Sequence, residues 1–200
     1  MPARIRFALL TGSAIALSLG GNARVGLEDS LWDGPGRLAE SNAAQVERIL
    51  KLCGDQGTRF EFECYDTSHL YNLANMLDRG LVRPPLFVQT VFGLLGGTGA
   101  DFEDLAHMHR TAHRLFGEDF EWSVLGAGSA QIRLGTIALS LGGNARVGLE
   151  DSLWDGPGKL AESNAAQVER ITAIAELLHR EIASPAEARR RLDLRDSGSR

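Results

Sequence analysis

The stretch of residues 146–151, Arg-Val-Gly-Leu-Glu-Asp, places one cation and two carboxylates within six positions. Side chains of an extended strand alternate between its two faces, so we expect Arg146, Gly148 and Glu150 to share one face. Charges on the inner face of a helix-covered sheet cost several kcal/mol unless they are paired or bound to a metal. The segment therefore predicts a polar site rather than a packed core strand, with Asp151 directly beside it.

A second stretch, residues 60–65, shows the same polarity. Phe60, Phe62 and Cys64 share one face, so Glu61, Glu63 and Tyr65 point the other way. One interpretation is a structural salt bridge between Arg146 and Glu61 or Glu63. The other is a metal site, because inward carboxylates outnumber the arginine and a divalent cation would neutralise the excess.

The elements that must position these side chains alternate along the chain. We expect strands over residues 60–65, 86–92, 122–125 and 145–150, and helices over residues 67–79, 101–116 and 131–141. A capping box, Asn164-x-x-Gln167, predicts a further long helix, and Ser184-Pro185 predicts a last short one. This alternation is typical of an α/β fold with parallel strands and outer helices.

Two other sets of residues could bind ligands. His107, His109 and His113 have metal-ligand spacing, but a histidine near the end of a helix that begins with acidic residues is also explained by the helix dipole. The loop "GLLGGTG", with Gly96 and Gly97, lies between an expected strand and helix and could cradle a phosphate, although a tight turn explains its glycines equally well.

Composition excludes several classes of protein. A hydrophobic fraction of 44% with 24% charged residues is ordinary for a globular protein, and the net charge of −5 argues against nucleic-acid binding. No apolar run approaches the roughly 20 residues of a membrane span, so no membrane partner is expected. The two cysteines lack Cys-x-x-Cys spacing, which favours a reducing cytoplasm over a disulfide framework.

The stretch "GGNARVGLED" followed by "LAESNAAQVERI", with "EFECYD" and "GLLGG" upstream, resembles the β-keto acid cleavage enzymes. The resemblance spans roughly residues 45 to 195. It implies a (β/α)8 barrel of the TIM type, of which this chain would hold about the C-terminal half. It also implies zinc, and a reaction of a small β-keto acid with acetyl-CoA as co-substrate that yields acetoacetate and a new CoA thioester.

The resemblance also implies roles for individual residues. Glu150 matches a zinc-ligating glutamate and Asp151 a catalytic acid/base, while Arg146 matches the arginine that orients it. Glu63 matches a glutamate placed in the active site by a neighbouring strand. The family's His-x-His pair for zinc lies on a barrel strand, whereas His107 and His109 fall on an expected helix.

One segment of the chain occurs twice. Residues 15–49 repeat residues 137–171 with one difference, Arg37 in place of Lys159, so that Arg24, Glu28 and Asp29 repeat Arg146, Glu150 and Asp151. Identity through loops indicates copying, because packing constrains loop residues weakly. We therefore expect an N-terminal segment 1–50 containing the copy, a half-barrel over residues 51–195 and a disordered tail 196–200, from a rearranged or truncated gene.

A half-barrel exposes strand edges and apolar surface, so we predict a homo-oligomer. Size-exclusion chromatography with light scattering checks this, and a sharp monomer peak with cooperative melting would contradict it.

Two other functions stay open: a non-catalytic remnant that serves as an oligomerisation or binding module, and a phosphate-binding barrel enzyme that uses the glycine loop.

Overall fold

The computed structural model describes residues 32–34, 37–38, 40–53 and 58–194. The chain divides into two compact units, residues 1–58 with 79–82 and residues 59–78 with 83–200, and each is described by itself. Arg24, Glu28 and Asp29 and the tail 196–200 lie outside the described residues.

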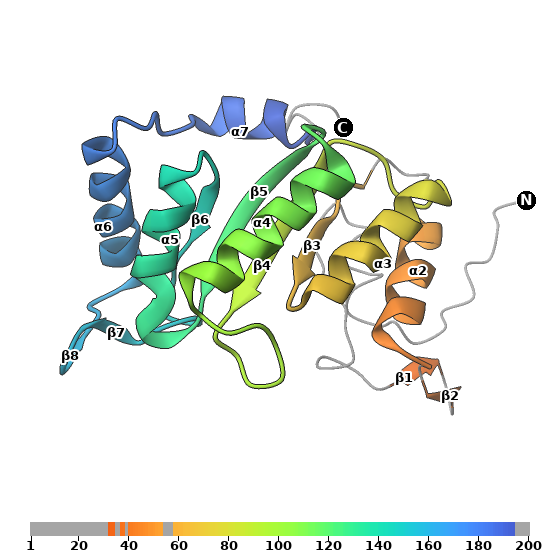
Figure 1. The fold of residues 1–200 in the computed structure, drawn as a ribbon, viewed down its shortest axis with the longest axis horizontal. Coiled ribbons are helices and arrows are strands. Elements are labelled where there is room, and N and C mark those ends of the chain that lie inside the picture. Colours follow the sequence, from red (N-terminus) through yellow and green to blue (C-terminus); the bar gives the residue numbers. More distant parts are fainter. Residues whose placement is uncertain (1–31, 35–36, 39, 54–57, 195–200) are drawn as a thin grey trace, which may run out of the picture. The chain divides into compact units, whose positions relative to one another are not determined.

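The larger unit is built on four parallel strands, in the spatial order β3 (Glu61–Cys64), β4 (Leu86–Phe92), β5 (Phe120–Gly126) and β6 (Asn144–Arg146). The helices α3 (Thr67–Asp78), α4 (Phe102–Phe116) and α5 (Gln131–Ser140) connect them and lie on one face of the sheet (Figure 1). The expected α/β arrangement with parallel strands and outer helices is therefore confirmed for these elements.

Burial of apolar side chains holds the helices on the sheet. The fully buried residues come from the strands and from the helix faces turned toward them, and they include Leu70, Val88, Phe92, Leu105, Met108, Val124 and Leu134. Removing a leucine-sized side chain from water contributes about 1.5–3 kcal/mol. The helices thus occupy one face of the sheet. Because side chains alternate between the faces of a strand, the polar side chains of the strands lie on the other face.

The strand expected over residues 145–150 was too long. β6 ends at Arg146, and residues 149–151 form a turn in which the Gly148 carbonyl accepts from the backbone N–H of Asp151 at 3.1 Å and of Ser152 at 3.0 Å. These bonds pair the backbone within the turn instead of with a neighbouring strand. The prediction that Glu150 lies on a strand face with Arg146 was wrong for this reason.

The prediction that Asn164 and Gln167 form the capping box of the next helix was also wrong. The helix α6 (Asn164–Leu177) is capped by Ser163, whose Oγ accepts from the Ala166 N–H at 3.0 Å. The last helix, α7 (Pro185–Arg191), begins as predicted, with Ser184 accepting from the Glu187 N–H. A short 3-10 turn, η2 (Gly128–Ala130), precedes α5.

The repeated segment folds alike where both copies are described. In the smaller unit β1 (Trp32–Gly34) pairs with β2 (Arg37–Leu38), and in the larger unit β7 (Trp154–Gly156) pairs with β8 (Lys159–Leu160) in the equivalent register. The helix α2 (Asn42–Cys53) then corresponds to α6, and Ser41 caps it at 3.1 Å as Ser163 caps α6. Local sequence is therefore sufficient to specify the hairpin and the helix.

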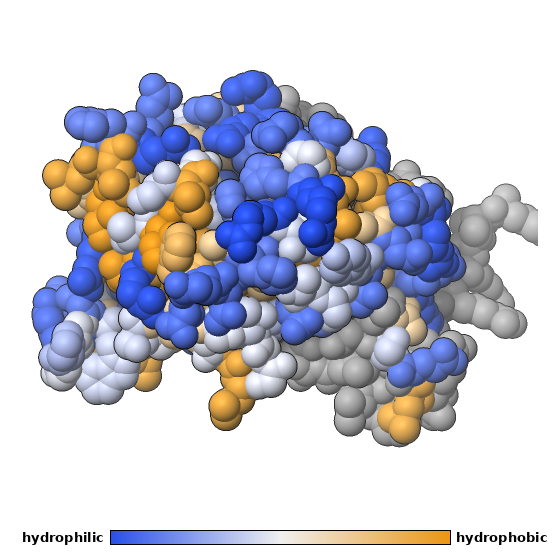
Figure 2. Space-filling model, viewed as in Figure 1, coloured by the Kyte–Doolittle hydropathy of each residue, from blue (hydrophilic) through white to orange (hydrophobic). Residues whose placement is uncertain are grey.

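Apolar side chains gather over α5 and α6 on the face shown in Figure 2. The exposed ones in this part of the chain are Leu141, Val168, Leu177, Leu178 and Ile182. Among the described helices, none combines the length and the apolar character that crossing a membrane requires.

We predict that Ser163→Ala lowers the free energy of unfolding by about 1 kcal/mol, because the Ala166 N–H loses its partner. Ser163→Thr keeps an acceptor oxygen and should lose less. Urea unfolding followed by circular dichroism measures both, and equal losses for the two variants would contradict the capping role.

Candidate active site

The polar face of the sheet carries a row of side chains in register. Glu63 on β3 pairs with Gln89 on β4, Gln89 with Ser123 on β5, and Ser123 with Asn144 on β6. Arg146 lies two residues beyond Asn144 and therefore on the same face. The row thus runs from one described strand to the next, and Arg146, the last residue of β6, lies at the carboxyl end, the side on which parallel sheets of this kind bind ligands.

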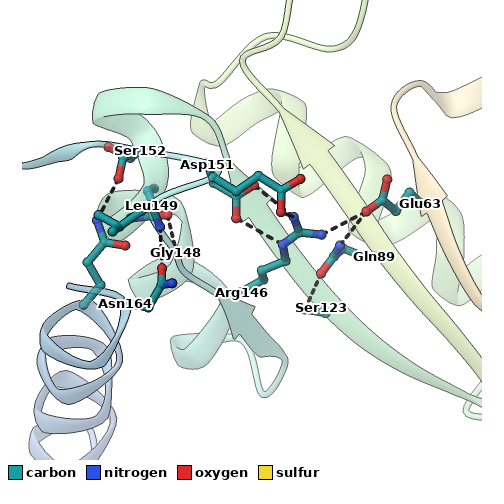
Figure 3. A network of polar contacts seen from close by, with 12 residues as sticks. Glu63, Gln89, Ser123, Arg146, Gly148, Leu149, Asp151, Ser152 and Asn164 are labelled. Atoms are coloured by element: carbon teal, nitrogen blue, oxygen red, sulfur yellow. Dashed lines mark hydrogen bonds and ion pairs between the residues drawn. The ribbon is translucent and has the colours of Figure 1, made fainter. Parts of the chain in front are cut away.

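Arg146 is the hub of the site, as Figure 3 shows. Its Nε and Nη2 donate to the two carboxylate oxygens of Asp151 at 3.0 and 3.1 Å, which makes a bidentate pair. Its Nη1 donates to Glu63 Oε1 at 2.9 Å and its Nη2 to Glu150 Oε2 at 3.1 Å. Arg146 therefore joins the three carboxylates that the sequence singled out.

Glu63 is fixed from its other side. The Tyr65 hydroxyl donates to Glu63 Oε2 at 2.8 Å, and Gln89 Nε2 donates to Oε1 at 3.3 Å. Ser123 donates in turn to Gln89 Oε1 at 3.4 Å. Of the two partners considered for a salt bridge with Arg146, Glu63 is the one that forms it. Glu61 is exposed at the start of β3.

The carboxylates differ sharply in exposure. The Asp151 side chain is 7% exposed and the Glu150 side chain 71%. Burial raises the pKa of the Asp151 carboxyl, although the Arg146 guanidinium opposes that shift. For Arg146, burial lowers the pKa and the Asp151 carboxylate raises it, with a net increase. Arg146 therefore stays a cation, while Asp151 takes up a proton more readily than an ordinary aspartate.

Three side-chain amides that sequence reasoning did not assign to the site bind the turn that carries Asp151. They are Gln131, Asn164 and Gln167, which bond the backbone of Gly148, Leu149 and Ser152. Gln131 and Gln167 are 2% exposed. A glutamine on the buried face of a helix is the signal that could have identified them, because buried amides need partners.

The glycine loop after β4 bonds largely to itself and to Tyr65, the residue that follows β3. Gly97 N–H donates to the Leu94 carbonyl at 3.1 Å, and Thr98 N–H donates to the Tyr65 carbonyl at 2.9 Å. Gly96 has φ +83°, a conformation that favours glycine. The Gly97 amide is therefore already engaged within the loop.

The histidines of α4 lie on the helix side of the sheet. The His109 ring packs on Trp122, with 4.1 Å between ring centroids, and its Nε2 lies 3.0 Å from His113 Nε2. Among the described residues, no group of three histidine, cysteine or carboxylate side chains is arranged so that it could hold a metal ion, although three carboxylates bond Arg146. The described side chains therefore do not fit the zinc that the resemblance implies.

Asp151 makes the stability of the fold depend on pH. Its pKa in the folded protein lies above the ordinary value of 3.8, so its contribution to stability is complete below pH 3.8 and is lost as the pH rises through the folded pKa. We expect the free energy of unfolding of the protein, minus that of Asp151→Asn, to fall as the pH rises above 3.8. Urea unfolding over a pH series measures it, and a difference that rises with pH would contradict the shift.

The sequence model of the family described as beta-keto acid cleavage enzyme matches residues 5–55 and residues 47–194. A 3,5-dioxohexanoate:acetyl-CoA acetone transferase from Paraburkholderia graminis is 64% identical over 156 residues, which cover 78% of this chain and 50% of that protein. A 3-keto-5-aminohexanoate cleavage enzyme from Fusobacterium nucleatum is 32% identical over 150 residues, 75% of this chain and 53% of that protein.

A third relative, a 3-oxoadipate:acetyl-CoA acetyltransferase from Cupriavidus necator, is 32% identical over 164 residues, which cover 82% of this chain and 55% of that protein. The chain thus spans about half the length of these curated relatives. Because the family's sequence model matches well over half of its residues, the chain belongs to the β-keto acid cleavage enzyme family.

Proposed function

We propose that this chain takes part in the cleavage of a β-keto acid with acetyl-CoA, which yields acetoacetate and an acyl-CoA. The observation that supports it is the nearly buried Asp151 carboxylate, held in a bidentate pair by Arg146. The names of the relatives supply the substrate class, since each either pairs a keto acid with acetyl-CoA or cleaves a keto acid.

The proposed reaction is an exchange of acyl groups. The bond between C2 and C3 of the keto acid breaks, and C2 forms a new bond to the acetyl carbonyl carbon. The acetyl–sulfur bond breaks, and the sulfur takes the acyl group that C2 has left. A base must first take a proton from C2 so that C2 can attack the acetyl carbon, and that proton returns to C2 after the C2–C3 bond has broken.

Asp151 is our proposed acid/base. Its raised pKa suits a group that accepts and returns a proton, because acid–base catalysis is most effective when the pKa approaches the working pH. Arg146 would orient the carboxylate, since both of its oxygens are bonded by the one guanidinium. Glu63 would hold Arg146 from the opposite side at 2.9 Å.

For the co-substrate, we propose that the loop with Gly96 and Gly97 borders acetyl-CoA. It follows β4 at the carboxyl side of the sheet, and its exposed residues include Leu95. Its bond from Thr98 to the Tyr65 carbonyl ties it to the residue that fixes Glu63.

The parallel sheet is compatible with part of a (β/α)8 barrel, and we propose that the remaining barrel strands come from outside the described residues. Zinc dependence would need ligands besides Glu150, whose carboxylate already accepts a bond from Arg146. The described residues offer no group of three such ligands, so no step is assigned to the metal.

The relative at 64% identity favours 3,5-dioxohexanoate as the first keto acid to test. Purified chain, 3,5-dioxohexanoate and acetyl-CoA should give acetoacetate, detected by NMR. We expect Asp151→Asn to lower the rate at least about 100-fold, the usual scale for loss of an acid/base.

The chain supplies a matched control, because Asp29 lies in the same sequence context in the first copy. Asp29→Asn should leave the rate within about twofold if Asp151 is the acid/base. Equal losses in both variants, or a rate unchanged in Asp151→Asn, would refute the assignment.

A second candidate is a non-catalytic module that binds its own copies. It is favoured by the exposed apolar side chains of α6 and the segment after it, among them Val168, Leu177 and Ile182. A folded chain that self-associates and makes no acetoacetate would support this candidate over the enzyme.

A further inference from the structure

The 148–152 turn carries Asp151 and connects β6 to the hairpin that follows. Two bonds within the turn, from Asp151 N–H and Ser152 N–H to the Gly148 carbonyl, give it its shape. They do not tie it to the sheet or to a helix. Contacts from outside the turn must therefore set where the Asp151 carboxylate lies relative to Arg146.

Those contacts come from the first turns of two helices. Gln131, the first residue of α5, accepts from Gly148 N–H through Oε1 at 2.9 Å. Asn164, the first residue of α6, accepts from Leu149 N–H through Oδ1 at 2.7 Å. The N–H groups of Gly148 and Leu149 are thus bonded by side chains of two different helices.

The far end of the turn is held as well. Gln167 Nε2 donates to the Ser152 carbonyl at 2.8 Å, and the Asp151 carbonyl accepts from Gly128 N–H at 2.8 Å. Backbone groups on both sides of the Asp151 side chain are therefore bonded to α5, to α6 or to the 3-10 turn before α5. Figure 3 shows Asn164 reaching the turn on the side away from Arg146.

The burial of the two glutamines indicates that these bonds are specific. Among the described residues, Gln131 Nε2 and Gln167 Oε1 are buried without a hydrogen-bond partner. Leaving a buried amide atom unpaired is unfavourable, so each glutamine is retained at the cost of one unpaired atom. What the glutamines provide is the bond that each makes to the turn.

The fit between Asn164 and the turn is close. A Cβ atom at Gly148 would lie 3.3 Å from Asn164 Oδ1, so a larger residue there would require that oxygen to move by a few tenths of an ångström. Sequence spacing suggested that Asn164 and Gln167 cap α6, but Ser163 performs the capping. Both side chains are thereby free to bond the turn.

We infer that Gln131, Asn164 and Gln167 are positioning residues that hold the 148–152 turn, and through it the Asp151 carboxylate, against Arg146. Their importance for catalysis rests on the proposed function. Their effect on the geometry of the turn does not, so the two parts can be tested separately.

Asn164 is the best residue to vary because its side chain is exposed, and Asn164→Ala should fold. In NMR hydrogen exchange, we expect the Leu149 amide and the Arg146 Nε–H to exchange about fivefold faster in Asn164→Ala, the scale of one lost hydrogen bond. Asn164→Asp keeps the acceptor oxygen and should restore slow exchange. Asn42→Ala, the same change in the first copy, should alter neither signal.

With substrate, Asn164→Ala should lower kcat about tenfold and leave KM within about twofold, because misplacing a catalytic group affects the reaction step. In the Asp151→Asn background the same change should lower kcat no further. Unchanged exchange at Leu149 and Arg146 in folded Asn164→Ala would overturn the inference. Faster exchange in a chain whose unmodified form makes no acetoacetate would support the positioning and reject the proposed function.

Discussion

The guanidinium of Arg146 is the interaction on which the site depends. It is the cation bonded to Glu63, Glu150 and Asp151, and removing it would leave the carboxylates of a partly buried cluster to repel one another. Lysine could not replace this arginine. The planar guanidinium has N–H donors at three nitrogens, whereas the single ammonium of lysine cannot bond both oxygens of Asp151 and also reach Glu63. The parallel sheet brings these residues together from positions far apart in the sequence.

Alternation predicted part of this site correctly and failed where the strand ended. Arg146 and Glu63 share a face because the two-residue period is a property of extended backbone, which sequence alone can follow. Glu150 departs from that period because a turn begins after Arg146. Asn164 and Gln167 were misassigned because a capping pattern and a tertiary contact use the same residue types, and Ser163 took the cap. A sequence pattern can mark Gln131 as a buried amide, but its bond to Gly148 depends on how α5 packs beside the turn.

The repeated segment separates local from non-local structure. Its hairpin and helix form in both copies, with the same strand pairing and the same serine cap. The site also uses Glu63 and Gln131, which lie outside the repeated stretch, and the residue that precedes the first copy by the same spacing as Gln131 is Leu9. Copying the segment therefore copies secondary structure, whereas the network around Arg146 uses residues that were not copied.

The identical segments also bear on how the chain folds. Both helices carry the same Val-x-x-Ile pattern, so the copied residues do not by themselves distinguish α2 from α6 for the contacts that α6 makes with α5. The second copy overlaps α5, and residues 141–163 separate α5 from α6, whereas residues 54–130, a stretch about three times longer, separate α2 from α5. Each doubling of loop length costs only about 0.6 kcal/mol, so chain connectivity favours the second copy modestly and leaves the exchanged arrangement as a competing folding product.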